Sequence, residues 1–488
     1  MRNPVASVDG PQIGACITIA FVFISVSFLF ANSYVFNLLT TCTTSDADIS
    51  NITDLNATDL NNISPFSVTE QSWLIFAVGI GTLIGTFVTL FTQSVNLVLS
   101  LTVFGVISGV LTVLMAVFDG FVPLLFLRLF HGVCLSPVFT ASVMICKTQK
   151  PFLIHIFLSM FHVPLGLIIM NPLIGSFCTN WAITNYILGA MKVLFIFLVT
   201  ISLFFTHQSN NVVVKKTSTL TYRVFINDTK QVSVFGSIFG TLFASQYIIQ
   251  FAHVYFISTH GLTLTTIGWV TPIPYILAVW IMALIYYATK YKPRPLSAMI
   301  SLFLCILFIL LALIPQNLAW LFMILFLIIF VGAAVSITCL LQMAPIPSAQ
   351  HLFYSAITIC LINGLSIVIL AVIVAAATYD GIETHWQSIF IAIAIVILVI
   401  LSLANIMRQI RHRKWAEFNV SIQKPENAEE ATADNIRPKQ GVIVRLESAC
   451  KVVSDRIHKL SIRPTESPDY SGNKTVAFIH DRERVTAV

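Results

Sequence analysis

Long apolar stretches, separated by short polar segments, follow one another along the chain as far as about residue 408. Each stretch is close to the ~20 residues that an α-helix needs to cross the hydrocarbon core of a bilayer. Helices are expected because lipid offers the backbone no hydrogen-bond partner, whereas membrane β-strands would appear as shorter alternating segments. The pattern therefore predicts an all-α integral membrane protein of about twelve transmembrane helices. The predicted spans are 13–39, 72–93, 95–117, 121–146, 151–175, 182–206, 232–257, 264–287, 295–315, 318–342, 352–377 and 386–408.

A polar connection at 207–231 divides these spans into two sets of six. We expect an N-terminal six-helix bundle over 13–206, a C-terminal six-helix bundle over 232–408, and a short segment, 1–12, before them. Residues 409–488 are polar and interrupted by prolines, which is typical of a mostly disordered tail. Small residues four positions apart predict close helix–helix approach. These pairs are Gly81/Gly85, Gly105/Gly109 and Gly236/Gly240.

Composition and charge agree with this topology. The chain is 57% hydrophobic and 10% charged, whereas soluble domains carry about 25% charged residues. The Lys and Arg residues of the connections all lie in even-numbered ones, and the tail is rich in them, while the odd-numbered connections contain Asp and Glu but no Lys or Arg. Because basic residues remain on the cytoplasmic side, both termini are predicted to be cytoplasmic. These loops also account for the net charge of +6, so nucleic acid is not an expected partner.

The first long connection, 40–71, is acidic and carries three glycosylation sequons, at Asn51, Asn56 and Asn62. A cluster of sequons predicts a glycosylated luminal or extracellular loop. The nine cysteines show neither a CxxC pair nor metal-ligand spacing. No metal or other cofactor is therefore predicted.

Charged side chains inside a membrane are costly and suggest function. The predicted spans contain no Asp or Glu, but Arg128 lies in the fourth span and Lys192 in the sixth. Each is a candidate contact for an anionic solute. Arg128 also fits a packing role in which it bonds backbone carbonyls, and Lys192 also fits a buried, neutral amine.

Other polar residues of the spans are candidates for a solute path. His155 and His162 lie one heptad apart and are candidate proton carriers, although a buried histidine also fits a packing role. Asn37, Tyr255 and Tyr275 are candidate solute contacts, and Gln246 belongs with them. Each of these also fits an interhelical hydrogen bond.

Several motifs resemble the anion–cation symporter branch of the major facilitator superfamily, which includes sialin, sodium/phosphate cotransporter-like proteins and vesicular glutamate transporters. The resemblance covers most of the membrane-spanning part and omits the tail. The most specific stretch joins spans 7 and 8. The matching residues are Arg128-Leu-Phe-His-Gly132, Gly166, Pro172-Leu-Ile-Gly175, Trp181, Tyr186, Gly189, Tyr255, Gly261, Gly268, Pro274, Tyr275, Met343-Ala-Pro345, Trp386 and Phe390.

The chain also departs from that branch. Val35 stands where the family has its span-1 arginine, and Leu135 where it has a span-4 carboxylate. The basic loop after span 2 is replaced by residues 92–96, and Gln342 replaces an acidic residue. The resemblance thus implies the major facilitator fold and a solute-transport ancestry, with Arg128 as a binding residue for an anion.

The resulting hypothesis is a secondary active or facilitative transporter of a small organic or inorganic anion, working by alternating access. Facilitative, H⁺-driven and Na⁺-driven modes all remain open. The alternative is a non-transporting relative that acts as a receptor, scaffold or chaperone. An enzyme is not expected, because the sequence shows no cluster of catalytic groups. The expected location is a plasma, lysosomal or vesicular membrane, and the C-terminal Thr486-Ala487-Val488 has the shape of a ligand for a carboxylate-capturing domain.

Overall fold

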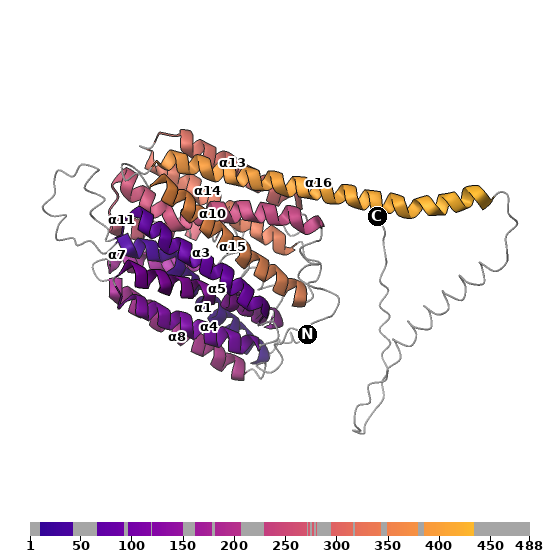
Figure 1. The fold of residues 1–488 in the computed structure, drawn as a ribbon. Helices are drawn as coiled ribbons and strands as arrows, with labels where there is room; N and C mark the ends of the chain where they lie inside the picture. The colour runs from indigo at the N-terminus through magenta and orange to yellow at the C-terminus, as the bar shows by residue number, and fades with distance from the viewer. Residues whose placement is uncertain are drawn as a thin grey trace, which may run out of the picture. The chain divides into compact units, whose positions relative to one another are not determined.

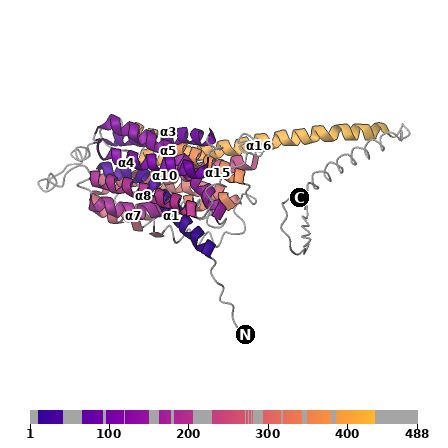
Figure 2. The same ribbon diagram turned by 90° about the horizontal axis from the view of Figure 1, so that it is seen from below.

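The structure is a computed structural model. It describes residues 10–41, 66–91, 96–118, 120–149, 162–177, 181–205, 229–270, 272–273, 276–277, 280, 294–315, 318–342, 349–378 and 385–433. Residues up to Arg413 belong to one compact unit, and Lys414–Val488 form a second unit. Within the first unit the helices run side by side (Figures 1 and 2).

Every predicted span overlaps one helix of the described part, which confirms the all-helical fold class. The helices of the N-terminal half are α1 (Gly10–Thr41), α3 (Val68–Phe91), α4 (Leu97–Met115), α5 (Phe121–Gln149), α7 (His162–Ser176) and α8 (Trp181–Phe205). Those of the C-terminal half are α10 (Thr229–His260), α11 (Leu264–Val270), α13 (Arg294–Leu313), α14 (Ala319–Gln342), α15 (Ala349–Ala377) and α16 (Trp386–Ala433).

Seven described helices contain apolar segments of membrane-spanning length. They are α1, α3, α4, α5, α8, α15 and α16. Helices α7, α13 and α14 contain shorter apolar segments. Helix α16 continues beyond the predicted end of its span at 408, because the residues that follow include good helix formers such as Ala, Glu, Gln and Lys.

Large apolar side chains cover the outside of the first unit. Phe91 is 85% exposed, and Phe205 and Trp280 are also largely exposed. The interior, by contrast, contains fully buried polar and cationic side chains. A soluble protein does not expose so much large apolar surface, so this distribution fits a chain whose surroundings are lipid.

Glycines allow the helices of each half to approach closely, as predicted. A Cβ atom on Gly81 would collide with the backbone of Leu129, which places α3 directly against α5. Similarly, Gly109 of α4 meets Val193 and Gly189 of α8. The predicted role of the small-residue pairs in close packing is confirmed, since backbone atoms or side-chain carbons occupy the space that a Cβ would need.

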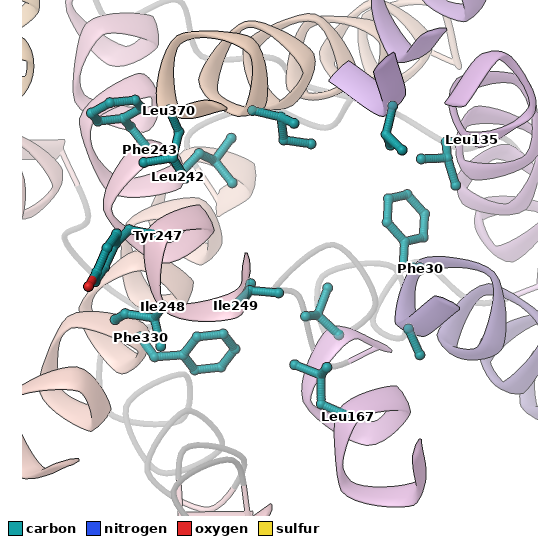
Figure 3. Packing of buried hydrophobic residues seen from close by; sticks show 14 of the residues in the cluster. Phe30, Leu135, Leu167, Leu242, Phe243, Tyr247, Ile248, Ile249, Phe330 and Leu370 are labelled. Carbon is teal, nitrogen blue, oxygen red and sulfur yellow. The ribbon is translucent and has the colours of Figure 1, made fainter. Parts of the chain in front are cut away.

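The two halves meet along a seam formed by four helix pairs: α3 with α15, α5 with α15, α7 with α11, and α1 with α10. Gly175 and Gly268 lie against each other where α7 crosses α11. Buried apolar side chains of both halves gather here, with Phe30, Leu135 and Leu167 on one side and Leu242 and Ile249 on the other (Figure 3). Helices α4 and α8, in contrast, pack mainly within their own half.

Candidate functional site

Arg128 is fully buried on α5, where it joins that helix to α1. Its Nη2 donates to the carbonyl oxygen of Ser33 at 2.7 Å, and its Nη1 donates to the carbonyl oxygen of Asn32 at 3.4 Å. The shorter bond is a strong one, whereas 3.4 Å is long for a hydrogen bond. Bonds to backbone carbonyls are expected if Arg128 has a packing role. Because carbonyls are uncharged, they do not neutralise the positive charge of the guanidinium.

His131 lies one turn further along α5 and is also fully buried. Its Nε2 lies 3.0 Å from the hydroxyl of Ser33, and its Nδ1 lies 3.1 Å from the hydroxyl of Ser108 on α4. It therefore bridges α1 and α4 through α5. The sequence pattern did not mark His131 as a candidate, although its spacing of three residues from Arg128 places both side chains on one helix face.

Lys192 of α8 is connected to the same region through Thr112. Its Nζ donates to Thr112 Oγ1 at 2.8 Å. Asn32 Nδ2 donates to that same oxygen at 2.8 Å, and the Thr112 hydroxyl donates to the carbonyl of Ser108 at 2.8 Å. Thr112 is thus the point at which α1, α4 and α8 are connected.

These residues form one buried cationic network, which we define as Asn32, Ser33, Ser108, Thr112, Arg128, His131 and Lys192. Arg128 and Lys192 are close enough to repel each other electrostatically, and both act on His131. Glu70 is the one carboxylate whose side chain is described, and it bonds the backbone and hydroxyl of Ser67. The side chains that face one another in the network are therefore cationic or neutral. The structure brings the predicted residues Arg128 and Lys192 together.

Unsatisfied polar atoms accompany the network. Asn32 Oδ1 has no hydrogen-bond partner, and neither does the side-chain amide of Asn185. Asn185 is fully buried and lies seven residues before Lys192 on α8, on roughly the same helix face. Buried polar atoms of this kind normally bond to a partner such as water or a ligand.

The interior of the C-terminal half is built from aromatic rings instead. Tyr255 packs against Phe322 at a centroid distance of 5.0 Å, against Trp386 at 5.4 Å and against Phe390 at 5.7 Å. Its hydroxyl has no hydrogen-bond partner. The predicted solute contact Tyr255 thus lies in an aromatic cluster, and the ring contacts found for it among the described residues are within the C-terminal half.

A pair of amides adds polarity to this half. Gln246 Nε2 of α10 donates to Asn363 Oδ1 of α15 at 2.7 Å. Gln250, one turn further on, approaches Gln246 Oε1 at the limiting distance of 3.5 Å. Gln246 therefore forms an interhelical hydrogen bond, the alternative to solute contact that its sequence position allows.

The remaining predicted residues are placed as follows. His162 packs against the rings of Phe30 and Phe139, at 5.1 and 5.7 Å. The side chain of Asn37 lies outside the described part, as do Tyr275, His155 and the sequons at Asn51, Asn56 and Asn62. Among described residues, no three His, Cys, Asp or Glu side chains are grouped as metal ligands would be.

Comparisons with known proteins show similar structures but no matching sequences. No protein-family model matches the chain, and no curated protein matches it. Among solved structures, the nucleoside transporter NupG is similar, with a TM-score of 0.55 and 12% sequence identity. That match covers 82% of this chain and 99% of NupG.

An aspartate-to-alanine mutant of NupG gives a TM-score of 0.56 at 14% identity, over 80% of this chain and 99% of the other. At such identities the likeness concerns the fold. The chain is a multi-pass α-helical protein with the fold of major facilitator transporters.

Proposed function

We propose that this protein carries a small solute across a membrane by alternating access. The observation that supports this most directly is the match to almost the full length of a solved transporter, NupG. The seam supports it as well, because two helical halves in contact along a few helix pairs are suited to rocking against each other.

The proposed solute carries a negative charge, which Arg128 and Lys192 hold. Two buried cationic side chains within mutual electrostatic reach are unfavourable unless an anion accompanies them or one loses its proton. The predicted spans offer no Asp or Glu. The ammonium of Lys192 has three N–H donors, and Thr112 is the hydrogen-bond partner found for it among the described residues. A carboxylate, phosphate or sulfate oxygen would satisfy these donors.

We place the solute's access to the buried cationic network beside helix α1. This helix contacts α5, α7 and α8 in its own half and α10 in the other half. Rocking of the halves would therefore change the contact between α10 and α1, the helix that carries Asn32 and Ser33. Asn37 and Tyr275 remain proposed solute contacts, and His155 and His162 remain proposed proton carriers.

Uptake into proteoliposomes tests the proposal. The panel contains monocarboxylates, dicarboxylates, phosphate and sulfate, with nucleosides as the class named for NupG, and each is assayed with and without an imposed H⁺ or Na⁺ gradient. We expect flux of at least one anion, and we expect Arg128→Ala to reduce it strongly. The gradients separate facilitative from coupled transport.

The alternative is a non-transporting protein that acts as a receptor, scaffold or chaperone. One observation favours it: Leu135, at the position of the resembled family's carboxylate, is 1% exposed and lies among apolar side chains of the seam (Figure 3). A solute path with Leu135 at this position lacks the carboxylate that the resemblance links to ion coupling. No uptake of any member of the panel, by a protein that remains folded, would support this alternative.

A further inference from the structure

The amide pair Gln246 and Asn363 lies in the middle of two long helices that border the seam. Gln246 is fully buried, and Asn363 keeps 6% of its surface exposed. Their 2.7 Å bond joins α10 to α15 within the C-terminal half. The bond therefore ties together two helices of one half, and both of these helices also contact the other half.

The neighbours of Asn363 show that this part of α15 faces the N-terminal half. Cys360, one turn earlier, lies against the hydroxyls of Ser136 and Thr140 on α5. Gly364, the next residue, approaches the side chain of Leu83 on α3. Asn363 is thus at the edge between the face that meets α10 and the face that meets the other half.

Gln246 has a similar position on α10. Leu242 and Ile249, four residues before it and three after it, share its helix face. In Figure 3, Ile249 projects toward the side chains Phe30 and Leu167 of the N-terminal half. The amide pair is therefore bordered by apolar side chains on the surface where the halves meet.

The hydrogen-bonding capacity of the pair is only partly used. Asn363 Oδ1 accepts one bond, but no hydrogen bond from its Nδ2 is found within the described part. The hydroxyl of Ser366, one turn further along α15, is fully buried and has no partner. At this depth in a membrane, water does not readily replace a missing partner. These donors fit an incoming acceptor atom.

The surroundings of the pair also restrict the chemistry of that acceptor. Among the described residues of the C-terminal half, the buried polar side chains are hydroxyls, amides and one histidine, with no Lys, Arg, Asp or Glu. An uncharged group is therefore favoured over an ionised one, because a buried charge needs a countercharge or several hydrogen bonds.

We propose that Gln246 and Asn363 form a subsite that hydrogen-bonds the uncharged polar part of the transported solute, a hydroxyl, carbonyl or amide group. This inference rests on the proposed transport function and adds to it a second, neutral point of recognition. In the described conformation the amides bond each other. When the solute binds, its acceptor receives the Asn363 Nδ2–H, and a solute donor competes for Gln246 Oε1.

The opposing explanation is that the pair only ties α10 to α15. Thr241→Val provides a matched control, because Thr241 is a buried polar residue of the same helix whose hydroxyl bonds the backbone of Ile238. The variants to compare with it are Gln246→Leu and Asn363→Leu. A purely structural role would lower their melting temperatures and leave the choice among solutes unchanged.

The experiment uses pairs of anions that differ by one hydroxyl: malate with succinate, and lactate with propionate. Each is assayed as a competitor of the anion whose uptake the panel establishes, in proteoliposomes containing the full chain. For the wild type and Thr241→Val we expect the hydroxylated member of at least one pair to compete about tenfold better, the value of roughly one hydrogen bond. In Gln246→Leu and Asn363→Leu this preference should disappear while the unhydroxylated member competes as before.

Two outcomes would overturn the subsite. In one, the wild type does not distinguish the members of either pair; in the other, the two variants keep the preference. In both cases uptake persists, so the proposed transport function stands while the subsite fails. Absence of uptake across the whole panel would instead count against the transport function itself, and the subsite would fall with it.

Discussion

The two halves of the molecule are built from the same kind of apolar helix, but their interiors differ in chemistry. In the N-terminal half, hydrogen bonds from Arg128, His131 and Lys192 join α1, α4, α5 and α8. In the C-terminal half, rings around Tyr255 and Tyr247 join α10, α13, α14 and α16. Aromatic packing is rigid and needs no ligand, whereas a buried positive charge carries an energetic cost. This difference fits the proposal that the N-terminal interior holds the charged part of the solute, whereas the C-terminal interior, apart from the amide pair Gln246 and Asn363, serves mainly stability.

The largest effect on stability is expected from the aromatic interior. Phe322 is fully buried and contacts the rings of Tyr255, Phe326 and Phe390. Phe322→Ala should lower the free energy of unfolding by about 3–5 kcal/mol, because it leaves a cavity. Denaturation of the purified protein in detergent measures this. Phe303→Ala is the control, since Phe303 is 48% exposed and its removal leaves no enclosed cavity. Equal stability of the two variants would contradict the role given to the ring cluster.

The next largest effect is expected on transport, at Arg128. Arg128→Met removes charged hydrogen bonds worth about 1.5–3 kcal/mol each, so anion uptake should fall about 10- to 100-fold. Arg128→Lys keeps the charge but lacks the fork that reaches two carbonyls, and it should give an intermediate value. Initial uptake rates at equal protein content provide the measurement. Full activity of Arg128→Met would mean that the buried cationic network plays no part in transport.

Lys192 should separate transport from stability. Lys192→Met should lower anion uptake about tenfold, the value of roughly one hydrogen bond to a charged group. Its free energy of unfolding should remain within about 1 kcal/mol of wild type or rise, because replacing a buried charge by an apolar side chain of similar size is often neutral or stabilising. Uptake and denaturation are measured on the same preparations.

Thr200→Val is the matched control for Lys192, since Thr200 also lies on α8 and its hydroxyl pairs with Thr102 at 2.8 Å. That variant should transport normally. If Lys192→Met were to unfold while retaining uptake per folded molecule, Lys192 would be a structural residue, and the contrast between the two interiors would weaken.

The smallest effect is expected at Tyr255. Tyr255→Phe keeps every ring contact and removes a hydroxyl that has no hydrogen-bond partner in the described structure. Stability should change by less than about 0.5 kcal/mol, in line with removal of a group that makes no bond, and uptake should be unchanged. A strong loss of uptake would instead show that the hydroxyl meets the solute, as the sequence pattern suggested, and would bring the aromatic interior into the transport path.

Much of the fold was predictable because burial in lipid leaves a simple signal. Length and hydrophobicity located twelve apolar segments, each of which overlaps a described helix, and glycine spacing predicted close helix–helix approach such as that of Gly81 on α3 to α5. The candidate site was only partly predictable from the sequence. Arg128 and Lys192 stood out as charges in apolar segments, but His131, Ser108 and Thr112 did not, because serine, threonine and histidine occur in many helices without functional roles. Parts of the predicted fifth and eighth spans lie outside the described residues.

By itself, the sequence determined that the chain is a bundle of membrane helices containing two intramembrane cations, since both facts depend on the identity of single residues and their apolar neighbours. Only the tertiary structure decided that Arg128 and Lys192 belong to one network, because they are carried by helices far apart in the chain and come together through Asn32 and Thr112. It also decided that Tyr255 belongs to an aromatic interior and that Gln246 meets Asn363 beside the seam. Which side chains share a buried space depends on how helices rotate and cross, and residue spacing within one helix does not contain that information.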